Sequence, residues 1–419
     1  MVVYGIPENS SVGAKYKHPA SESVESSMRL AILQQSYGRF GGAERLAFSH
    51  YIQMRRMGLD VTMYYTGRIS SGWKERLADE PLQTIPTGVA SSPDRFRQLM
   101  RFLDELRNYD RIIIHHHIEP ILAFYLSKYL GPRIVWYSGS VFELPWEEVI
   151  TGVDYRRISP TVRRTGSEFY GGLLSSLLLS NPMYGLTARL ARVIDIETVR
   201  GYGKVLANSF FLSKFLSRVY RLKKEPGVVY PGPDPLLEQL AANNHFGEHD
   251  YMLAVGSLIP LKNVESIVKA AAGVRSSKLV LVGDGQEKSR LKDLGAHLDV
   301  PMEFWGTMDG EDELAKAYGE CKFLVHLSLY EPFGLTPVEA GLFSKPSIVT
   351  SYGGPPEVVL DEVTGYVVNP KDHKLIRSRM DTLLADPSRR RDMGRRAREN
   401  IMRKFTLEAS TKKLLSEIE

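Results

Sequence analysis

The stretch from Ser328 to Glu357, SLYEPFGLTPVEAGLFSKPSIVTSYGGPPE, is the most informative segment of this chain. Glu331 lies in a short loop, and a helix is expected to follow, with Thr336 as its cap and Pro337 in its first turn. Glu339 comes three positions after that cap, a spacing that a simple capping box would also produce. Free backbone N–H groups at a helix start form a site for an anion such as phosphate.

A carboxylate on each side of a phosphate site suits a nucleotide-sugar. One acidic side chain would accept hydrogen bonds from the ribose hydroxyls, because a carboxylate has two acceptor oxygens. The other would contact the sugar. We therefore expect Glu331 and Glu339 to bind opposite ends of one activated sugar.

Size and composition favour a globular enzyme of two or three domains, with 419 residues and 25% charged residues. The single cysteine, Cys321, excludes disulfides within the chain and a cysteine metal cluster, and we expect it in a buried strand. The net charge of +5 is modest, and no basic segment alternates with aromatic residues in the way that favours nucleic acid. No signal-peptide layout or membrane-spanning apolar run is found, so a cytoplasmic protein is expected, with peripheral contact to the inner membrane face as an open alternative.

Apolar runs alternate with helical segments from Met28 onward, which predicts an α/β fold of parallel sheets covered by helices. Ligands are then expected at the carboxyl ends of strands that face the cleft between two similar halves. In the first half, strands are expected near Met28 and at 61–65, 111–115, 133–137, 204–207 and 227–230. In the second half, they are expected at 252–255, 279–282, 302–305, 323–326, 347–349 and 365–368.

The prolines at 231, 233 and 235 interrupt regular structure and mark a connection between domains. We divide the chain into a poorly ordered extension at 1–27, an N-terminal acceptor-side domain at 28–235, a C-terminal nucleotide-sugar-binding domain at 245–400, and a final helix at 401–419.

The sequence allows two interpretations for each of two segments. Residues 142–200 break the alternation and contain basic pairs followed by an apolar run, 173–179. This pattern indicates either a helical insertion packed on the first domain or a patch for a membrane surface or lipid-linked acceptor. The basic run at 388–405 is either a solvated helix or a face directed toward anionic lipid.

The paired-glutamate segment resembles the signature of retaining nucleotide-sugar glycosyltransferases of the GT-B fold, family 4, also called glycosyl transferases group 1. In that family seven residues separate two glutamates, and Phe-Gly comes just after the first glutamate, as Phe333 and Gly334 do here. The resemblance implies two Rossmann-like domains facing across a cleft, with the last helix crossing back to the first domain. Further landmarks in the family's order cover most of the chain beyond Met28: GGAE (41–44), NS (208–209), YPGPD (230–234), VGSLIPLKN (255–263), LVGDG (281–285) and the Gly353-Gly354 turn with Glu357.

The resemblance also implies roles for single residues. Lys262 matches the family lysine on the donor diphosphate, but Ser257 stands where the family has an arginine, so one phosphate contact is missing or is supplied from elsewhere. Glu339 would bind the ribose, and Glu331 the sugar near its reacting carbon. The catalytic candidates are Glu331, Lys262 and His117. The donor-binding candidates are Gly42, Gly256, Lys262, Gly283, Phe333, Gly334, Leu335, Thr336 and Glu339.

Three consecutive histidines, His115, His116 and His117, follow a predicted strand. Successive side chains of an extended chain point to alternate sides, so the three do not readily meet one metal ion. The family often has a histidine near the donor sugar after this strand. We assign His117 to that position, with His116 as the alternative and ordinary packed histidines as the third interpretation.

The expected activity is transfer of a hexose, mannose or glucose favoured, from a GDP- or UDP-sugar to an acceptor hydroxyl. Family resemblance implies retention at the anomeric carbon, no cofactor and no required metal. The acceptor is expected in cell-envelope, lipid-linked or glycoprotein glycan synthesis, and no nucleic-acid partner is expected. Two alternatives stay open: a GT-B nucleotide-sugar epimerase, which needs no acceptor, and a noncatalytic nucleotide-sugar-binding protein. Ser257 is a small point in favour of the latter, and the presence of Glu331, Glu339 and Lys262 argues against it.

Overall fold

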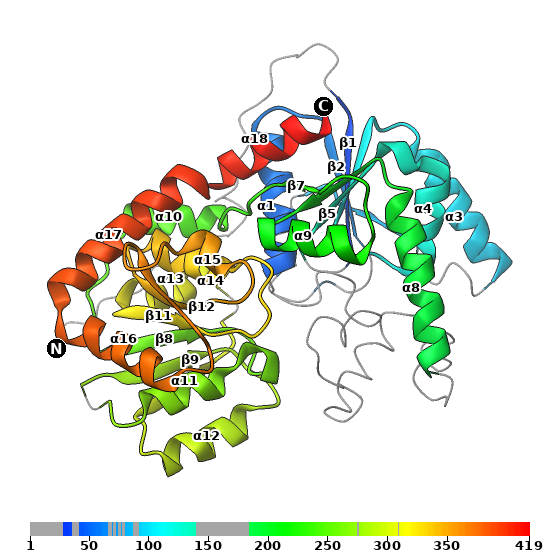
Figure 1. Ribbon diagram of the computed structural model, residues 1–419. Coiled ribbons are helices and arrows are strands. Elements are labelled where there is room, and N and C mark those ends of the chain that lie inside the picture. The colour runs from blue at the N-terminus through cyan, green and yellow to red at the C-terminus, as the bar shows by residue number, and fades with distance from the viewer. Residues whose placement is uncertain are drawn as a thin grey trace, which may run out of the picture.

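Two parallel β-sheets covered by helices form the described part of the chain (Figure 1). The computed structural model describes residues 28–35, 42–65, 69, 73, 77, 80–86, 92–139, 184–274, 276–308 and 310–419. The predicted extension at 1–27 and most of the predicted insertion, 142–183, lie outside these residues. The two sheets confirm the prediction of two similar α/β halves.

The first sheet has seven strands in the order β3-β2-β1-β4-β5-β6-β7, with parallel pairing. All residues of β1 and β5 are buried, because helices cover both faces of the sheet, and this is why these strands read as continuous apolar runs. The strands are β1 (Leu30–Gln34), β2 (Val61–Tyr65), β3 (Gln83–Thr84), β4 (Arg111–His115), β5 (Ile134–Ser138), β6 (Lys204–Ala207) and β7 (Gly227–Val228). The helices around them are α1 (Gly42–Arg56), α3 (Pro93–Leu106), α4 (Pro120–Leu130), α8 (Tyr184–Arg200) and α9 (Phe210–Val219).

The second sheet has six strands in the order β10-β9-β8-β11-β12-β13, again parallel. Its strands are β8 (Tyr251–Val255), β9 (Lys278–Val282), β10 (Met302–Gly306), β11 (Phe323–His326), β12 (Ser347–Thr350) and β13 (Gly365–Val368). The helices are α10 (Pro235–Asn243), α11 (Val264–Ala271), α12 (Lys288–His297), α13 (Glu311–Glu320), α14 (Leu335–Leu342), α15 (Pro355–Val358), α16 (His373–Ala385), α17 (Pro387–Lys404) and α18 (Leu407–Ile418).

Each sheet changes direction at one point in its strand order. In the second sheet the chain moves outward from β8 through β9 and β10, and then returns to place β11 on the other side of β8. Loops that leave β8 and β11 diverge at such a point, which opens a crevice for ligands at the carboxyl ends of the strands. The residues after β8 and β11 include Lys262 and Glu331, so the fold brings two distant predicted site residues to the same edge.

The predicted proline-rich connection contains a helix. Asp234 accepts a hydrogen bond from the backbone N–H of Leu236, and Pro235 occupies the first helical position, so α10 begins there. Pro235 therefore starts a helix instead of interrupting regular structure. Helix α10 packs on α13 and α14 of the second sheet, and both predicted domain boundaries at its ends stay predictions.

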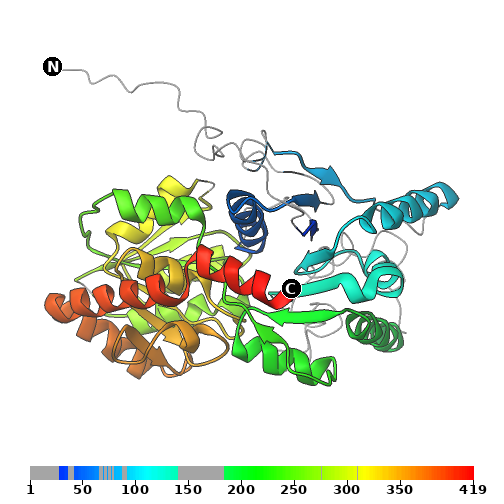
Figure 2. The same ribbon diagram turned by 90° about the horizontal axis from the view of Figure 1, so that it is seen from above.

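The C-terminal helices connect the two halves (Figures 1 and 2). Helix α17 packs on α14 and ends at Lys404, and α18 crosses to lie against α1. Leu414, Leu415 and Ile418 of α18 belong to the same buried cluster as β1 and α1 residues. The segment predicted as one helix at 401–419 is thus the end of α17 followed by α18, with Thr406 capping the second helix through the N–H of Ala409.

Two further sequence expectations can be compared with the structure. Cys321 is fully buried as expected, but it follows α13 and precedes β11, so its placement in a strand was wrong. Within the described ranges, no helix combines the length and apolar character that crossing a membrane requires.

Candidate active site

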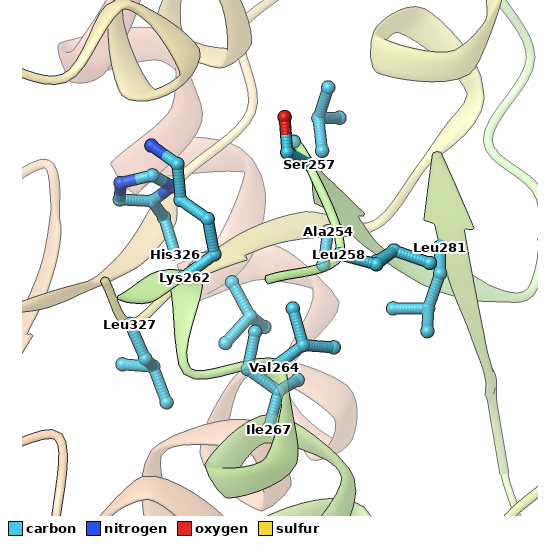
Figure 3. Close-up of a pocket in the computed structure, with 12 residues that line it drawn as sticks. Ala254, Ser257, Leu258, Lys262, Val264, Ile267, Leu281, His326 and Leu327 are labelled. Carbon is cyan, nitrogen blue, oxygen red and sulfur yellow. The ribbon is translucent and has the colours of Figure 1, made fainter. Parts of the chain in front are cut away.

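The candidate site lies at the carboxyl ends of β8 and β11, where a small pocket is lined by predicted residues (Figure 3). Ser257 and Lys262 come from the loop after β8, and His326 is the last residue of β11. In Figure 3 the amino group of Lys262 lies beside the His326 ring, above an apolar floor. The floor residues are Ala254, Leu258, Val264, Ile267, Leu281, Val325 and Leu327.

Two glycines fix the backbone on one side of this pocket. A Cβ at Gly283 would lie 2.0 Å from the carbonyl oxygen of Gly256, and Gly283 has a φ of 128°, so a side chain is excluded on both grounds. The backbone N–H of Gly256 donates to Val282 at 2.9 Å, and that of Leu258 donates to Asp284 at 2.9 Å. The structure therefore places Gly256 and Gly283 side by side, and their donor contacts stay predictions.

Lys262 and Glu331 form an ion pair, with 2.6 Å between Nζ and Oε2. Nε2 of His326 lies 3.2 Å from the same oxygen. Burial alone would raise the pKa of the Glu331 carboxyl, but Lys262 and His326 outweigh it and hold that pKa well below its usual range. Two of the three predicted catalytic residues thus meet, and Glu331 stays ionised.

The backbone around this ion pair is held from two sides. Asn263, which follows Lys262 in a left-handed conformation with φ of 51°, donates through Nδ2 to the carbonyl of Leu327 at 3.1 Å. A Cβ at Gly353 would lie 2.2 Å from the carbonyl of Glu331, so the Gly353-Gly354 turn can pack this closely only because Gly353 has no side chain. The turn then donates the Gly354 N–H to that carbonyl at 2.8 Å.

Helix α14 begins beside the pair without a side-chain cap. Its N-cap is Gly334, with φ of 106°, and no side chain among the described residues accepts from the first turn. The prediction that Thr336 caps the helix was wrong, because Gly334 starts it two residues earlier and the Thr336 hydroxyl lies 3.1 Å from Nδ1 of His326. The first N–H groups of a helix can donate to an anion, and the donor contact of Leu335 stays a prediction. Phe333 is buried, with its ring 5.7 Å from that of Tyr230, so its side chain is structural.

Glu339 is buried, with 2% of its side chain exposed. Oε1 accepts from Nη2 of Arg45 at 2.7 Å, and Oε2 accepts from the hydroxyl of Tyr318 at 2.7 Å. Arg45 comes from α1 of the first half, so this ion pair spans the two sheets. Each carboxylate oxygen has a second lone pair, so the assignment of Glu339 to the ribose hydroxyls stays a prediction.

The first half contributes Gly42 and the histidines. Gly42 is the first residue of α1, and a Cβ there would lie 3.1 Å from Cδ1 of Leu335, so the starts of α1 and α14 approach each other. The His117 ring packs 5.5 Å from Trp136, whereas His116 takes a left-handed conformation with φ of 57°. The role of His117 stays a prediction.

A second contact between the halves involves Glu357. Its carboxylate accepts from the backbone N–H groups of Phe210 and Phe211 at 2.9 and 2.8 Å, and from the Tyr230 hydroxyl at 2.9 Å. The Ser209 hydroxyl donates to the carbonyl of Pro332 at 2.5 Å. Both landmarks, NS and the Gly-Gly turn with its glutamate, therefore serve to join the halves.

Sequence reasoning missed three residues of this site: Arg45, Tyr318 and His326. His326 had a signal, because it ends a predicted strand at a carboxyl edge. Arg45 follows the GGAE landmark directly but carries no spacing that points to Glu339, 294 positions away. Tyr318 lies on a helix with no pattern that distinguishes it from a core residue.

Residues 237–400 match the family described as glycosyl transferases group 1. We call these matched residues, 237–400, the group 1 domain. The predicted family resemblance is thereby confirmed, while retention and family 4 stay predictions. The group 1 domain contains Lys262, Glu331 and Glu339, so the ion pair and the uncapped helix lie within the matched residues.

One relative extends the likeness over most of the chain. Alpha-1,3/1,6-mannosyltransferase ALG2 of Dictyostelium discoideum is 24% identical over 430 residues, covering 91% of this chain and 96% of that protein. An uncharacterized glycosyltransferase of Methanocaldococcus jannaschii is 32% identical over 160 residues, covering 37% of this chain and 41% of that protein. The chain thus spans about two fifths of the length of the first curated relatives it matches.

Solved structures show the same fold. HepE of Anabaena, in a crystal structure with UDP, has a TM-score of 0.68 at 17% identity, covering 93% of this chain and 99% of that one. The predicted GT-B architecture of two Rossmann-like domains is therefore confirmed. The family and the relatives named above are glycosyltransferases, in agreement with the predicted enzyme class.

Proposed function

We propose that this protein transfers a sugar from a nucleoside-diphosphate sugar to an acceptor hydroxyl. One observation carries the proposal: the Lys262–Glu331 ion pair lies beside the uncapped start of α14, within the group 1 domain. A cation and free amides at one point suit a diphosphate, and an ionised carboxylate beside them suits the sugar.

The chemistry that follows from this arrangement is mostly electrostatic. The bond between the anomeric carbon and the diphosphate oxygen breaks, and negative charge grows on the leaving group. Lys262 and the first amides of α14 stabilise that charge. The acceptor oxygen bonds to the same face of the carbon, and its proton passes to the departing phosphate. The configuration at the carbon is thereby retained, and we propose that no metal ion is required.

The donor and acceptor are proposed at a finer level. The mannosyltransferase relative supports mannose, with GDP-mannose ahead of UDP-glucose as donor. A lipid-linked or cell-envelope glycan acceptor suits the basic and apolar segment at 142–200. We propose a cytoplasmic protein that works at the inner membrane surface.

A thermal-shift screen with UDP-, GDP- and ADP-sugars tests the proposal, and the stabilising donor is then incubated with and without candidate acceptors. We expect one nucleotide class to raise the melting temperature, and sugar transfer to continue in EDTA. Conversion of the donor into a different nucleotide-sugar without acceptor would establish the epimerase instead. Donor binding with no reaction under either condition would establish the noncatalytic protein, and no stabilisation by any donor would overturn the proposal.

A further inference from the structure

Arg45 is a residue of the site that the proposed function leaves unused, and this inference rests on that function. It lies in the first turn of α1, and its side chain is 12% exposed. Only Nη2 is engaged, by Glu339. The Nε and Nη1 atoms are buried, and neither has a hydrogen-bond partner among the described residues.

The guanidinium of Arg45 is protonated and carries a positive charge. Burial by itself would lower the pKa of the guanidinium, but Glu339, Asp234 and Glu311 together raise it above its usual value. A cation with two unused donors therefore lies next to the carboxylate assigned to the ribose. Buried donors of this kind are unfavourable unless a ligand or partner accepts from them.

On the opposite side of the site, Lys262 is the cation proposed for the diphosphate, but it is also paired with Glu331, and the neighbouring pocket position is Ser257. The N-terminus of α14 supplies only partial charge. Because Gly42 approaches Leu335 closely, α1 brings Arg45 to the same helix start.

We propose that Arg45 binds the diphosphate of the donor from the opposite domain. Nη2 keeps Glu339 oriented for the ribose, and Nε and Nη1 donate to phosphate oxygens of the same ligand. A planar guanidinium presents donors along both of its edges, so it can contact Glu339 and phosphate oxygens together, whereas a lysine ammonium is a point charge. The donor, held by the second domain, thus recruits the first domain through its phosphates.

The test compares a nucleoside diphosphate with its own nucleoside. Calorimetry is performed with UDP and uridine, or GDP and guanosine, according to which diphosphate stabilises the wild type. For Arg45→Ala we expect diphosphate affinity to fall about ten- to hundredfold, the range of one or two charge-assisted hydrogen bonds. Nucleoside affinity should change far less. Arg55→Ala, an exposed arginine at the end of the same helix, is the matched control and should leave both affinities unchanged.

Arg45→Lys provides the second variant. It keeps a cation near Glu339, so it remains available if Arg45→Ala fails to fold, and it should still lose most of the preference for diphosphate over nucleoside. Adding Ser257→Arg to Arg45→Ala should restore part of that preference from the other side of the site.

The outcomes separate the two proposals. A wild type that binds none of the diphosphates overturns the proposed function and this inference with it. A wild type that binds one, with the same preference in Arg45→Ala and Arg45→Lys, overturns the inference alone. Equal loss of nucleoside and diphosphate would likewise show that Arg45 only orients Glu339.

Discussion

The carboxylate of Glu357 lies across the start of α9 and accepts a hydrogen bond from the backbone N–H of Phe210 at 2.9 Å. With the Phe211 N–H and the Tyr230 hydroxyl, it makes three hydrogen bonds between the second sheet's turn and the first half. A carboxylate at a helix N-terminus is favoured by both the free amides and the helix dipole. Glu357 therefore acts as a side-chain cap supplied by the other domain.

Glu357→Ala should open the two domains. The variant loses an anionic cap on α9, and we expect about 1–2 kcal/mol less favourable contact between the halves. Small-angle scattering checks this through a larger radius of gyration in the absence of ligand. Glu399→Ala, which removes an exposed carboxylate on α17, is the control and should scatter like the wild type. Equal curves for all three proteins would contradict the capping role.

Removing the partners of Glu331 should change the pH dependence of transfer. In the wild type, Lys262 and His326 keep the pKa of Glu331 depressed, so it is ionised from mildly acidic pH upward. In Lys262→Met, burial remains while the main opposing charge is gone, so the pKa rises and the acid limb of kcat moves to higher pH. The profile of kcat against pH measures this, and superimposable acid limbs would contradict it.

The same ion pair carries a stability contribution with a defined sign. Because the folded pKa of Glu331 is depressed, its contribution to the free energy of unfolding is present above the unfolded carboxyl pKa of about 4.3 and is lost as the pH falls toward the folded value.

Glu331→Gln should slow transfer at neutral pH about a hundredfold or more, as removal of a preorganised electrostatic group does. Nucleotide binding should be little changed, and calorimetry beside the product assay distinguishes the two.

Glu339→Ala should weaken nucleotide binding, and Tyr318→Phe should do so more mildly. The buried Tyr318 hydroxyl donates to Oε2 of Glu339, and its loss should cost about 1–3 kcal/mol of unfolding free energy. Tyr251→Phe removes a comparable buried bond, which goes to the backbone carbonyl of Ala317 at 2.8 Å and not to Glu339. Denaturant unfolding should show similar losses in both, whereas only Tyr318→Phe should bind uridine or guanosine more weakly. Equal nucleoside binding in both would remove Tyr318 from the site.

Acid should destabilise the fold through the buried His50. Nε2 of His50 lies 2.8 Å from the Ser410 hydroxyl of α18, and Nδ1 lies 3.4 Å from His115. Burial, and then His116, lower the pKa of His50 to about 3. Between the unfolded pKa of about 6.5 and the folded value, the unfolded state binds more protons. The free energy of unfolding therefore decreases as the pH is lowered, by about 1.4 kcal/mol per pH unit.

Replacing His50 should reduce that slope. His50→Gln is expected to flatten the fall of unfolding free energy between pH 6 and 4, measured by denaturant titration at each pH. His297→Gln, at an exposed position in the last turn of α12, should keep the wild-type slope. A wild-type slope in both variants would show that His50 does not titrate on unfolding.

Membrane contact is expected to depend on the basic pairs at 156–157 and 163–164. Charge reversal of these four arginines should reduce flotation with anionic liposomes, because each basic side chain near the surface contributes about 1 kcal/mol. Neutral liposomes should bind both proteins equally. Unchanged flotation with anionic vesicles would count against the proposed surface.

Continuous apolar runs made most strands predictable. The strands at 323–326 and 347–350 are buried on both faces, so they consist mostly of apolar residues and could be recognised from the sequence. Lys262 and Glu331 were also predictable, because each follows a strand that the fold places at one edge. Thr336 was not, because a left-handed Gly334 competes with a side-chain cap, and sequence spacing does not show which one starts the helix. The Arg45–Glu339 pair depends on how two domains meet, which no local pattern contains.

Helix α18 completes a core that begins hundreds of residues earlier. Its backbone carbonyl at Ile418 accepts from Nε of Arg111 in β4, 307 positions away, and its apolar face is buried among β1 and α1. During synthesis the core of the first domain therefore cannot be completed until the second domain and α18 have left the ribosome. A fragment cut between β7 and β8 would expose apolar residues of α1 that α18 covers, and expressing that half alone calls for residues 407–418 to be supplied as a fused or added peptide.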